Sequence, residues 1–263
     1  MPTENLRVAL VPIDIKLGDV RHNVAWACEC INNLEEGIDL VVLPELFNVG
    51  FGDYSVSPEH LAEPDDGPTV SRMLELSRIK NVAIVGGFLA TDGKNLYNRA
   101  FAVYAGKTLA FYNKRHLFAG PESRIFRPGQ EESPIVDVKG WKLRIAICYD
   151  LRFPVWNRAV DNNYDALIIV ANWPNSRYYA WSHLIKARAI ENQAYVAACN
   201  REGKDVYGTY MRHDSMVVNA MGYDVSEPAD GANVYATFDA SRLNDDRKFL
   251  QPWRVADKFQ LIL

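Results

Sequence analysis

Short apolar segments of strand length recur along this chain, and three of them end on a residue that can take part in chemistry. The runs LVVLP, TLAFYN and LRIAI lead directly into Glu45, Lys114 and Cys148. In α/β proteins the loops at the carboxyl ends of strands hold ligands, so reactive side chains collect there. Each residue alone has an ordinary explanation, since a buried Cys is a small core hydrophobe and Glu and Lys are usually solvated. Their joint recurrence at strand ends makes a hydrolytic site the leading hypothesis.

The order of the predicted elements indicates an α/β fold. Over the first third of the chain, apolar strands alternate with amphipathic helices, which is typical of parallel strands joined by helical crossings. Farther on, strands follow one another closely, and the turn Ala105-Gly106-Lys107 signals a hairpin. This mixture favours a mixed sheet, or two sheets packed face to face with helices outside, over a single doubly wound sheet. Strands are expected at 6–13, 38–43, 82–88, 97–104, 108–112, 134–138, 142–147, 166–170, 195–199, 213–219 and 233–238, and helices at 19–34, at 69–79, within 150–161, and from a cap at Asn175 or Ser176 to about 192.

Composition and length exclude several classes of protein. The chain has 263 residues, of which 48% are hydrophobic, so it can bury a substantial core. No linker rich in Ser, Pro or Gly divides it. We expect a single domain over residues 1–263 whose last stretch, about 20 residues long, is a tail available for dimer contacts. The net charge of −4 and the lack of a Lys/Arg-rich block argue against nucleic-acid binding. No apolar run is long enough to span a membrane.

The cysteines and histidines do not indicate a metal site or a disulfide framework. Four cysteines in a chain of this length, without a recognisable signal peptide, fit the reducing cytoplasm. Cys28 and Cys30 lie two positions apart in an expected helix and therefore face different directions, and the five histidines are scattered. Gly86-Gly87 lacks the spacing of a dinucleotide fingerprint. We therefore expect neither a metal nor a cofactor.

Three segments of the chain resemble, in order, the three signatures of the nitrilase superfamily of carbon–nitrogen hydrolases. They are LPE at 43–45, NKRHLF at 113–118 and CYDLRFP at 148–154. ANWP at 171–174 and KARAIENQ at 186–193 fit the same family, and the resemblance runs from near residue 6 to about residue 240. CYDLRFP followed by ANWP is most similar to bacterial omega-amidases, which cleave the distal amide of 2-oxoacid amides. True nitrilases tend to carry Cys-Trp-Glu at the nucleophile, where this chain has Cys-Tyr-Asp.

The resemblance implies a fold and a set of catalytic roles. The fold is a four-layer α-β-β-α sandwich that forms homodimers or larger homo-oligomers, usually by pairing through an outer helical layer. Glu45 takes the role of general base, Lys114 that of electrostatic stabiliser and Cys148 that of nucleophile. Glu122 occupies the place of a second glutamate that is common in the family, in a loop whose length varies among relatives.

The chemistry of amide hydrolysis calls for the same residue types. A thiol splits a difficult reaction into acylation and deacylation. A carboxylate within hydrogen-bond reach can take the thiol proton and later deliver it to departing ammonia. The oxygen of the tetrahedral intermediate becomes negative, and an ammonium together with a backbone N–H can stabilise it. Lys114 and the amide of Tyr149 are the expected donors.

Substrate specificity is expected to depend on residues near the nucleophile. An oxoacid amide carries a carboxylate, which calls for a cation, most naturally Arg. Arg152 is such a cation unless it forms an ion pair with Asp150 or Asp161, whereas Arg177 is expected to be structural at a helix start. Arg188 and Glu191, three apart on a helix, are expected to pair. The expected substrate-binding set, whose aromatic members could instead only pack in the core, is Phe118, Tyr149, Arg152, Asn172 and Trp173.

Three alternatives remain open on the sequence alone. An N-carbamoyl amino acid, another aliphatic amide or a nitrile could replace the oxoacid amide as substrate. A Cys-His hydrolase would need His116 or His183 as base and a glycine-flanked nucleophile, which Cys148 lacks. A catalytically silent binding module would be favoured by loss of Glu45, Lys114 or Cys148, and all three are present.

Overall fold

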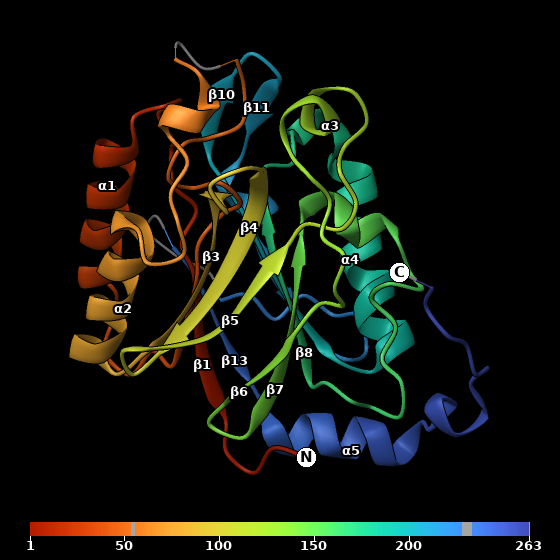
Figure 1. Ribbon diagram of the computed structural model, residues 1–263. Coiled ribbons are helices and arrows are strands. Elements are labelled where there is room, and N and C mark those ends of the chain that lie inside the picture. The colour runs from red at the N-terminus through yellow and green to blue at the C-terminus, as the bar shows by residue number, and fades with distance from the viewer. Residues whose placement is uncertain (54–55, 228–232, 263) are drawn as a thin grey trace.

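The computed structural model describes residues 1–53, 56–227 and 233–262, and two β-sheets packed face to face form its centre (Figure 1). The first sheet has six strands in the order β13-β1-β2-β3-β4-β5, and the second has five in the order β12-β9-β8-β7-β6. The strands of the first sheet are β1 (Leu6–Leu10), β2 (Leu40–Val42), β3 (Ala83–Thr91), β4 (Leu96–Tyr104), β5 (Lys107–Asn113) and β13 (Val234–Phe238). Those of the second are β6 (Ile135–Val138), β7 (Trp141–Ile147), β8 (Ala166–Ala171), β9 (Tyr195–Asn200) and β12 (Met216–Val218).

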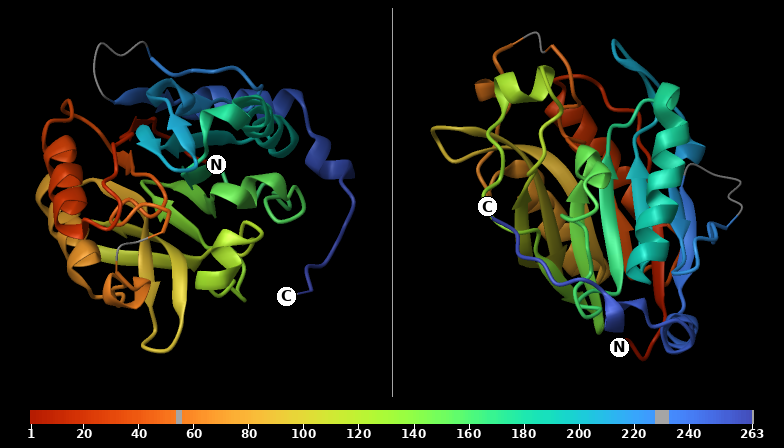
Figure 2. Two further views of the ribbon diagram at one scale, coloured as in Figure 1. Left: turned by 90° about the horizontal axis from the view of Figure 1, so that it is seen from above. Right: turned by 90° about the vertical axis from the view of Figure 1, so that its right-hand side faces the viewer.

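Helices cover the outer faces of both sheets. The helix α1 (Val20–Asn32) connects β1 to β2, and α2 (Pro68–Lys80) connects β2 to β3, as parallel pairing of these strands requires. The helix α4 (Tyr178–Asn192) does the same between β8 and β9. The views in Figures 1 and 2 show α1 and α2 on one side of the paired sheets and α4 on the other. The four-layer α-β-β-α sandwich expected from the sequence is confirmed.

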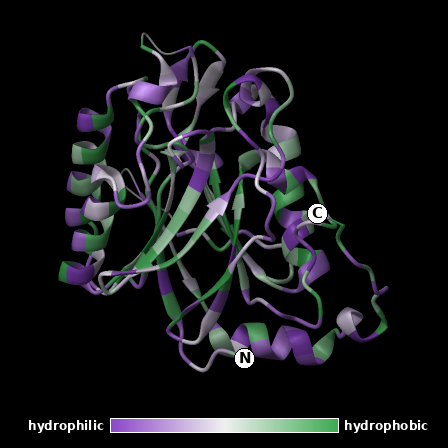
Figure 3. Cartoon of the chain, in the orientation of Figure 1, coloured by the Kyte–Doolittle hydropathy of each residue, from purple (hydrophilic) through white to green (hydrophobic). Residues whose placement is uncertain are grey.

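The main hydrophobic core lies between the two sheets. Alternate residues of β1, including Leu6 and Val8, share one buried cluster with alternate residues of β7, including Leu143 and Ile145. A second cluster joins the other face of the first sheet to α1 and α2. Figure 3 shows the consequence of this layering: the central strand β8 is largely hydrophobic, whereas α1 and α2 carry hydrophilic residues on their outer sides.

The hairpin between β4 and β5 follows the sequence prediction. Ala105 and Gly106 form its turn with φ values of 49° and 75°, and a positive φ at both central positions is what a two-residue turn of type I′ requires. The strands predicted at 6–13 and 213–219 are shorter in the structure than expected. The first ends at Leu10, and the second is reduced to β12 because residues 212–214 form a turn of 3₁₀-helix.

Several features of the structure were not predicted from the sequence. The polar stretch 115–132 contains a short helix, α3 (Pro121–Ile125), and β10 (Gly203–Asp205) and β11 (Gly208–Tyr210) form an additional hairpin. The cap predicted for α4 was wrong: a 3₁₀ turn occupies Asn175–Arg177, and the residue at the helix start is Arg177, which makes no side-chain cap bond. Pro174, Ser176 and Arg177, in or next to this turn, line the cavity described below, which local capping preferences do not reveal.

Part of the expected C-terminal tail belongs to the folded body. Residues Ala240–Phe249 form the helix α5, which closes one end of the sandwich (Figure 1). Its buried Arg247 donates to Asp165 Oδ1 at 2.6 Å and to the carbonyl of Gln193 at 2.9 Å. This arrangement fastens α5 to the loops that precede β8 and β9. No helix among residues 1–53, 56–227 and 233–262 is long and apolar enough to cross a membrane.

Trp141 gives a test of the core. Its ring is fully buried, lies 5.3 Å from Phe238 and 5.8 Å from Tyr195 between ring centroids, and donates its N–H to the carbonyl of Glu4. We expect Trp141→Ala to lower the free energy of unfolding by about 3–5 kcal/mol, because it empties a site that joins both sheets. Urea denaturation measures this. Trp26→Ala, at a position 39% exposed on α1, serves as the control and is expected to change the value by no more than about 0.5 kcal/mol; equal losses would contradict the packing argument.

Candidate active site

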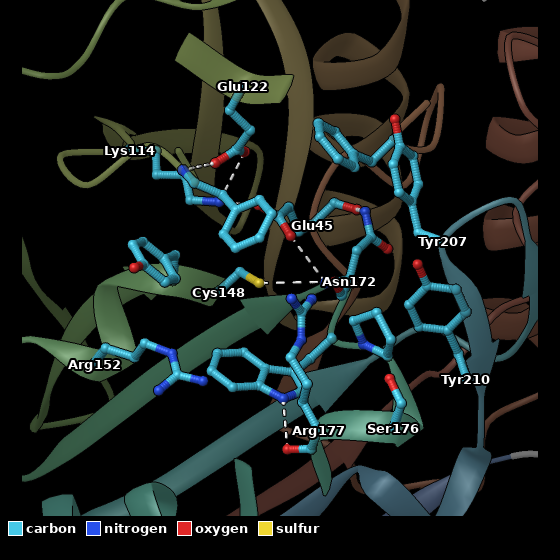
Figure 4. A pocket seen from close by; sticks show the side chains of 15 residues that line it. Glu45, Lys114, Glu122, Cys148, Arg152, Asn172, Ser176, Arg177, Tyr207 and Tyr210 are labelled. Atoms are coloured by element: carbon cyan, nitrogen blue, oxygen red, sulfur yellow. Dashed lines mark hydrogen bonds and ion pairs between the residues drawn. The ribbon is translucent and has the colours of Figure 1, made fainter. Parts of the chain in front are cut away.

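A cavity of about 170 Å³ lies at the carboxyl ends of strands from both sheets (Figure 4). Glu45 and Lys114 follow β2 and β5 of the first sheet, whereas Cys148 and Asn172 follow β7 and β8 of the second. The structure therefore brings the three strand-end residues together in one site. All nine residues expected from the sequence line the cavity: Glu45, Lys114, Phe118, Glu122, Cys148, Tyr149, Arg152, Asn172 and Trp173.

Cys148 occupies a constrained turn at the end of β7. Its φ of 44° is in the left-handed region, which residues other than glycine rarely adopt and which often marks functional sites. The buried Asp150 holds this turn, because its Oδ2 accepts from the Ile147 N–H at 3.1 Å and from the Tyr112 hydroxyl at 2.7 Å. The Cys148 thiol points to the carbonyl of Asn172, with 3.8 Å between Sγ and oxygen.

A buried ion-pair network lies beside the thiol. The Lys114 ammonium donates to Glu45 Oε1 at 2.6 Å and to Glu122 Oε1 at 2.8 Å. All three side chains are no more than 3% exposed, so water does not screen these charges. Glu122 reaches the network from α3, a short helix that stands in place of the expected loop. Figure 4 shows the lysine and both carboxylates on one side of Cys148.

Backbone donors hold the remaining carboxylate oxygens. Glu45 Oε2 accepts from the Asn172 N–H at 2.9 Å, and the Asn172 side chain donates in return to the Glu45 carbonyl at 3.0 Å. These two bonds connect the first sheet to the second across the site. Glu122 Oε2 accepts from the Phe118 N–H at 2.6 Å. Both carboxylates are therefore fixed at both oxygens, and little reorganisation is needed during a reaction.

Burial and neighbouring charges set the protonation of the site. Burial, reinforced by the negative charge of Glu45, raises the pKa of Cys148 well above its usual range. Burial opposes the charge on Lys114, but the adjacent Glu122 and Glu45 outweigh it and raise the pKa of the lysine. Burial also raises the pKa of Glu122, against the opposing effect of Lys114. The resting nucleophile is thus a neutral thiol beside a charged lysine, and it needs a base to become reactive.

Two arginines border the cavity close to the thiol (Figure 4). The Arg152 guanidinium carbon lies 4.9 Å from the Trp173 ring centroid, and that of Arg177 lies 5.1 Å from the Phe118 centroid. Neither guanidinium has a carboxylate partner among residues 1–53, 56–227 and 233–262. The alternative pairing of Arg152 with Asp150 or Asp161 is therefore absent from this part of the chain. Arg177 lies at the start of α4, as expected, and its side chain also borders the cavity.

The structure separates the other charged candidates from the site. Arg188 pairs with Glu191 at 2.9 Å, as predicted. His116 is bound through Nδ1 to Asp150 Oδ1 at 2.8 Å and stacks on Phe153. His183 lies on α4 and contacts the Tyr179 carbonyl. Because neither histidine lines the cavity, the arrangement does not provide a Cys-His pair. Within the described parts of the chain, no group of three or more His, Cys, Asp or Glu side chains could hold a metal ion.

Comparison with known proteins agrees with this geometry. The family model described as carbon-nitrogen hydrolase matches residues 7–248. The chain belongs to this family. It is 38% identical to the omega-amidase YafV of Escherichia coli K12, over 86% of this chain and 87% of that protein, and 30% identical to the 2-oxoglutaramate amidase of Bacillus subtilis, over 84% and 85%. A carbon-nitrogen hydrolase superfamily structure from Xanthomonas campestris, XC1258, superposes with a TM-score of 0.90 at 32% identity, covering 98% of this chain and 100% of that one. This chain is therefore an amide-hydrolysing enzyme, and the alternative of a catalytically silent binding module is set aside.

Sequence reasoning missed several residues of the site. Asn98, on β4, contacts both carboxylates, and Phe51, Tyr207 and Tyr210 line the cavity from loops and from the β10–β11 hairpin. Asn98 had one available signal: alternation along β4 places it on the same face as the apolar Leu96 and Ala100. A polar residue on a buried strand face marks a need for hydrogen-bond partners. The tyrosines had no such signal, because their contacts depend on how the hairpin folds back.

Gly87 gives a test of how the fold positions the base. A Cβ at this position would lie 2.9 Å from both Glu45 Cα and Leu46 N, so any larger residue must displace the backbone that carries Glu45. We expect Gly87→Ala to lower kcat for amide hydrolysis roughly tenfold to a hundredfold, because small displacements of catalytic groups are costly. Steady-state kinetics measures this. Gly93→Ala, in the turn between β3 and β4 with no atom within 4 Å of its added Cβ, is the control and should affect stability alone; equal kcat values for the two variants would count against the argument.

Proposed function

We propose that this enzyme hydrolyses the amide of a small carboxylate-bearing substrate to the acid and ammonia through a thioester on Cys148. The first candidates are 2-oxoglutaramate and 2-oxosuccinamate. One observation carries the proposal: a neutral buried thiol lies in the same small cavity as a lysine-bridged pair of carboxylates and two arginines that have no carboxylate partner among the described residues. The names of the relatives from E. coli and B. subtilis point to the same class of substrate.

Acylation begins with the transfer of a proton. Glu45 takes the proton of the Cys148 thiol, and sulfur attacks the amide carbonyl carbon. The carbonyl oxygen becomes an oxyanion, which Lys114 and the N–H of Tyr149 stabilise. Each such donor is typically worth about 3 kcal/mol in the transition state. The C–N bond then breaks as Glu45 returns the proton to the leaving nitrogen, which gives ammonia and a thioester.

Deacylation reverses these roles with water as the nucleophile. Glu45 takes a proton from water, whose oxygen attacks the thioester carbonyl, and the same donors hold the second oxyanion. Collapse of this intermediate breaks the C–S bond and releases the acid, and Glu45 passes its proton to the sulfur, which restores the thiol of Cys148. Glu122 holds Lys114 from the other side throughout, so that the ammonium stays fixed between two carboxylates.

The two arginines provide the specificity of this proposal. A cavity of about 170 Å³ admits a small substrate and excludes a large one. Arg152 and Arg177 lie over the faces of aromatic rings, which orient a guanidinium without neutralising it. Both side chains are exposed at the rim of the cavity and are therefore available to bind the distal carboxylate, a contact that an aliphatic amide or nitrile does not make. N-carbamoyl amino acids also carry a carboxylate and are the second candidate class.

We also propose that the enzyme works in the reducing cytoplasm and as a homodimer or larger homo-oligomer. All four cysteines are free, as a catalytic thiol requires. Exposed apolar side chains on the outer side of α4 and in the C-terminal segment, including Tyr179, Ile190 and Val255, favour self-association. Light scattering of the purified protein distinguishes an oligomer from a monomer.

The covalent step gives the first test of this function. We expect Cys148→Ala to abolish ammonia release from 2-oxoglutaramate, because the substitution removes the sulfur that forms the acyl-enzyme. Rapid acid quenching of the wild-type reaction followed by peptide mass spectrometry should find the acyl group on the peptide containing Cys148. Cys30→Ala, outside the cavity, is the matched control and should retain turnover. Activity in Cys148→Ala, or an acyl group on another residue, would refute the mechanism.

The charge of the substrate gives the second test. A hydrogen bond to a charged group contributes about 1.5–3 kcal/mol, so a neutral amide of equal length should be hydrolysed with roughly a tenfold to hundredfold lower kcat/KM than 2-oxoglutaramate. Arg152→Met and Arg177→Met should each lower kcat/KM for the charged substrate and leave the value for the neutral amide nearly unchanged. If wild type does not discriminate between the two substrates, carboxylate recognition is ruled out, while the Cys148 chemistry remains.

A further inference from the structure

Asn98 is completely buried in β4 and lies between the two carboxylates of the site. Its side-chain nitrogen donates to Glu45 Oε1 at 2.7 Å and to Glu122 Oε1 at 2.8 Å. These are the same two oxygen atoms that accept from the Lys114 ammonium, at 2.6 and 2.8 Å. Two oxygens and two donor nitrogens thus form a closed arrangement, in which the amide and the ammonium each bridge the carboxylates.

The charges of this arrangement do not balance, so neutral hydrogen-bond donors are needed to stabilise the excess negative charge. Glu45 and Glu122 carry two negative charges when both are ionised, and Lys114 supplies one positive charge. The other titratable and charged groups of the cavity are Cys148, whose thiol is neutral, the guanidiniums of Arg152 and Arg177, and the phenols of Tyr149, Tyr207 and Tyr210. An uncompensated buried negative charge is costly, and hydrogen bonds to the ionised form lower that cost. Asn98 supplies two such bonds.

The bonding pattern also determines which oxygen of Glu45 is available. A carboxylate oxygen has two lone pairs. On Oε1 of Glu45, Lys114 and Asn98 take both, whereas on Oε2 the Asn172 N–H takes one. The carbonyl of the same Asn172 accepts from the Cys148 thiol. The remaining lone pair of Glu45 is therefore on Oε2. This oxygen accepts from the N–H of Asn172, the residue whose carbonyl the thiol contacts.

We propose that Asn98 is a positioning residue for the reaction: its two N–H groups hold Oε1 of Glu45 and of Glu122 against Lys114, which leaves Glu45 Oε2 to take the thiol proton. This inference rests on the proposed function, in which Glu45 is the base. It assigns a task in the reaction to a residue that touches neither the substrate nor the thiol.

The proposal predicts a change in pH dependence. Removal of both donors disfavours the ionised carboxylates, so the pair takes up a proton at a higher pH than before. Since the reaction needs Glu45 ionised, the acid limb of the kcat/KM profile should move to higher pH, by about one to two units for the one hydrogen bond that each carboxylate loses. At pH values above the new limb, kcat/KM should recover to within roughly tenfold of wild type, because Cys148 and Lys114 remain in place.

The experiment compares Asn98→Leu and Asn98→Ser with wild type. Leucine resembles asparagine in size and branching but has no donor, and serine is small enough to fit if leucine disturbs the strand. Ammonia release from 2-oxoglutaramate gives kcat/KM across the pH range, and thermal unfolding reports the fold. Asn192→Leu is the matched control, because Asn192 is a buried amide at the end of α4 that bonds to Arg188 and Ala159, outside the cavity. It should lose stability and keep the wild-type acid limb.

The outcomes separate this inference from the proposed function. An upward shift of the acid limb in an Asn98 variant, with recovery at higher pH, supports the positioning role. A wild-type limb, an equal loss of rate at every pH, or loss of the fold in both Asn98 variants would assign Asn98 a structural role only and overturn the inference. If wild type releases no ammonia, or if Cys148→Ala remains active, the proposed function itself fails, whatever the Asn98 variants do.

Discussion

The ion pair between Lys114 and two buried carboxylates is the interaction on which the rest of the site depends. Its partners come from three separate segments: Lys114 follows β5, Glu45 follows β2 and Glu122 lies on α3. A buried charge that loses its partner is strongly destabilising, so the loops that carry these residues must fold to bring all three together. The chemistry and the local fold thus impose the same requirement. The raised pKa of Lys114 follows from it, because burial alone would lower that pKa.

The nucleophile depends on a third buried carboxylate, that of Asp150, which has no place in the chemistry. Asp150 accepts hydrogen bonds from the Ile147 N–H and the Tyr112 hydroxyl, and its other oxygen accepts from His116. Tyr112 belongs to the first sheet and Ile147 to the second, so Asp150 joins both sheets beneath Cys148. This support offsets the cost of the left-handed backbone at Cys148. His116, a candidate base on sequence grounds, is occupied by this structural task.

Much of the architecture could be predicted because its signals are local. Amphipathic periodicity located α1 and α2, and short apolar runs located β2, β7 and β8. The strand ends gave Glu45, Lys114 and Cys148 directly. Elements without a strong pattern were missed: α3 is five residues long, and α5 carries charged residues that pair with the body of the protein. The start of α4 was misassigned because a 3₁₀ turn, and not a side-chain cap, precedes the helix.

The sequence by itself determined which reactive groups stand at the ends of apolar strands, and hence that a thiol, an ammonium and a carboxylate would share one edge of the fold. Only the tertiary structure decided which polar residues complete the site. Asn98 reaches the carboxylates because β4 pairs with both β3 and β5, and Arg177 borders the cavity from the 3₁₀ turn that precedes α4. The physical reason is the range of the signals. Periodicity and strand ends are properties of a few consecutive residues, whereas a hydrogen bond between segments depends on how two sheets and their loops pack.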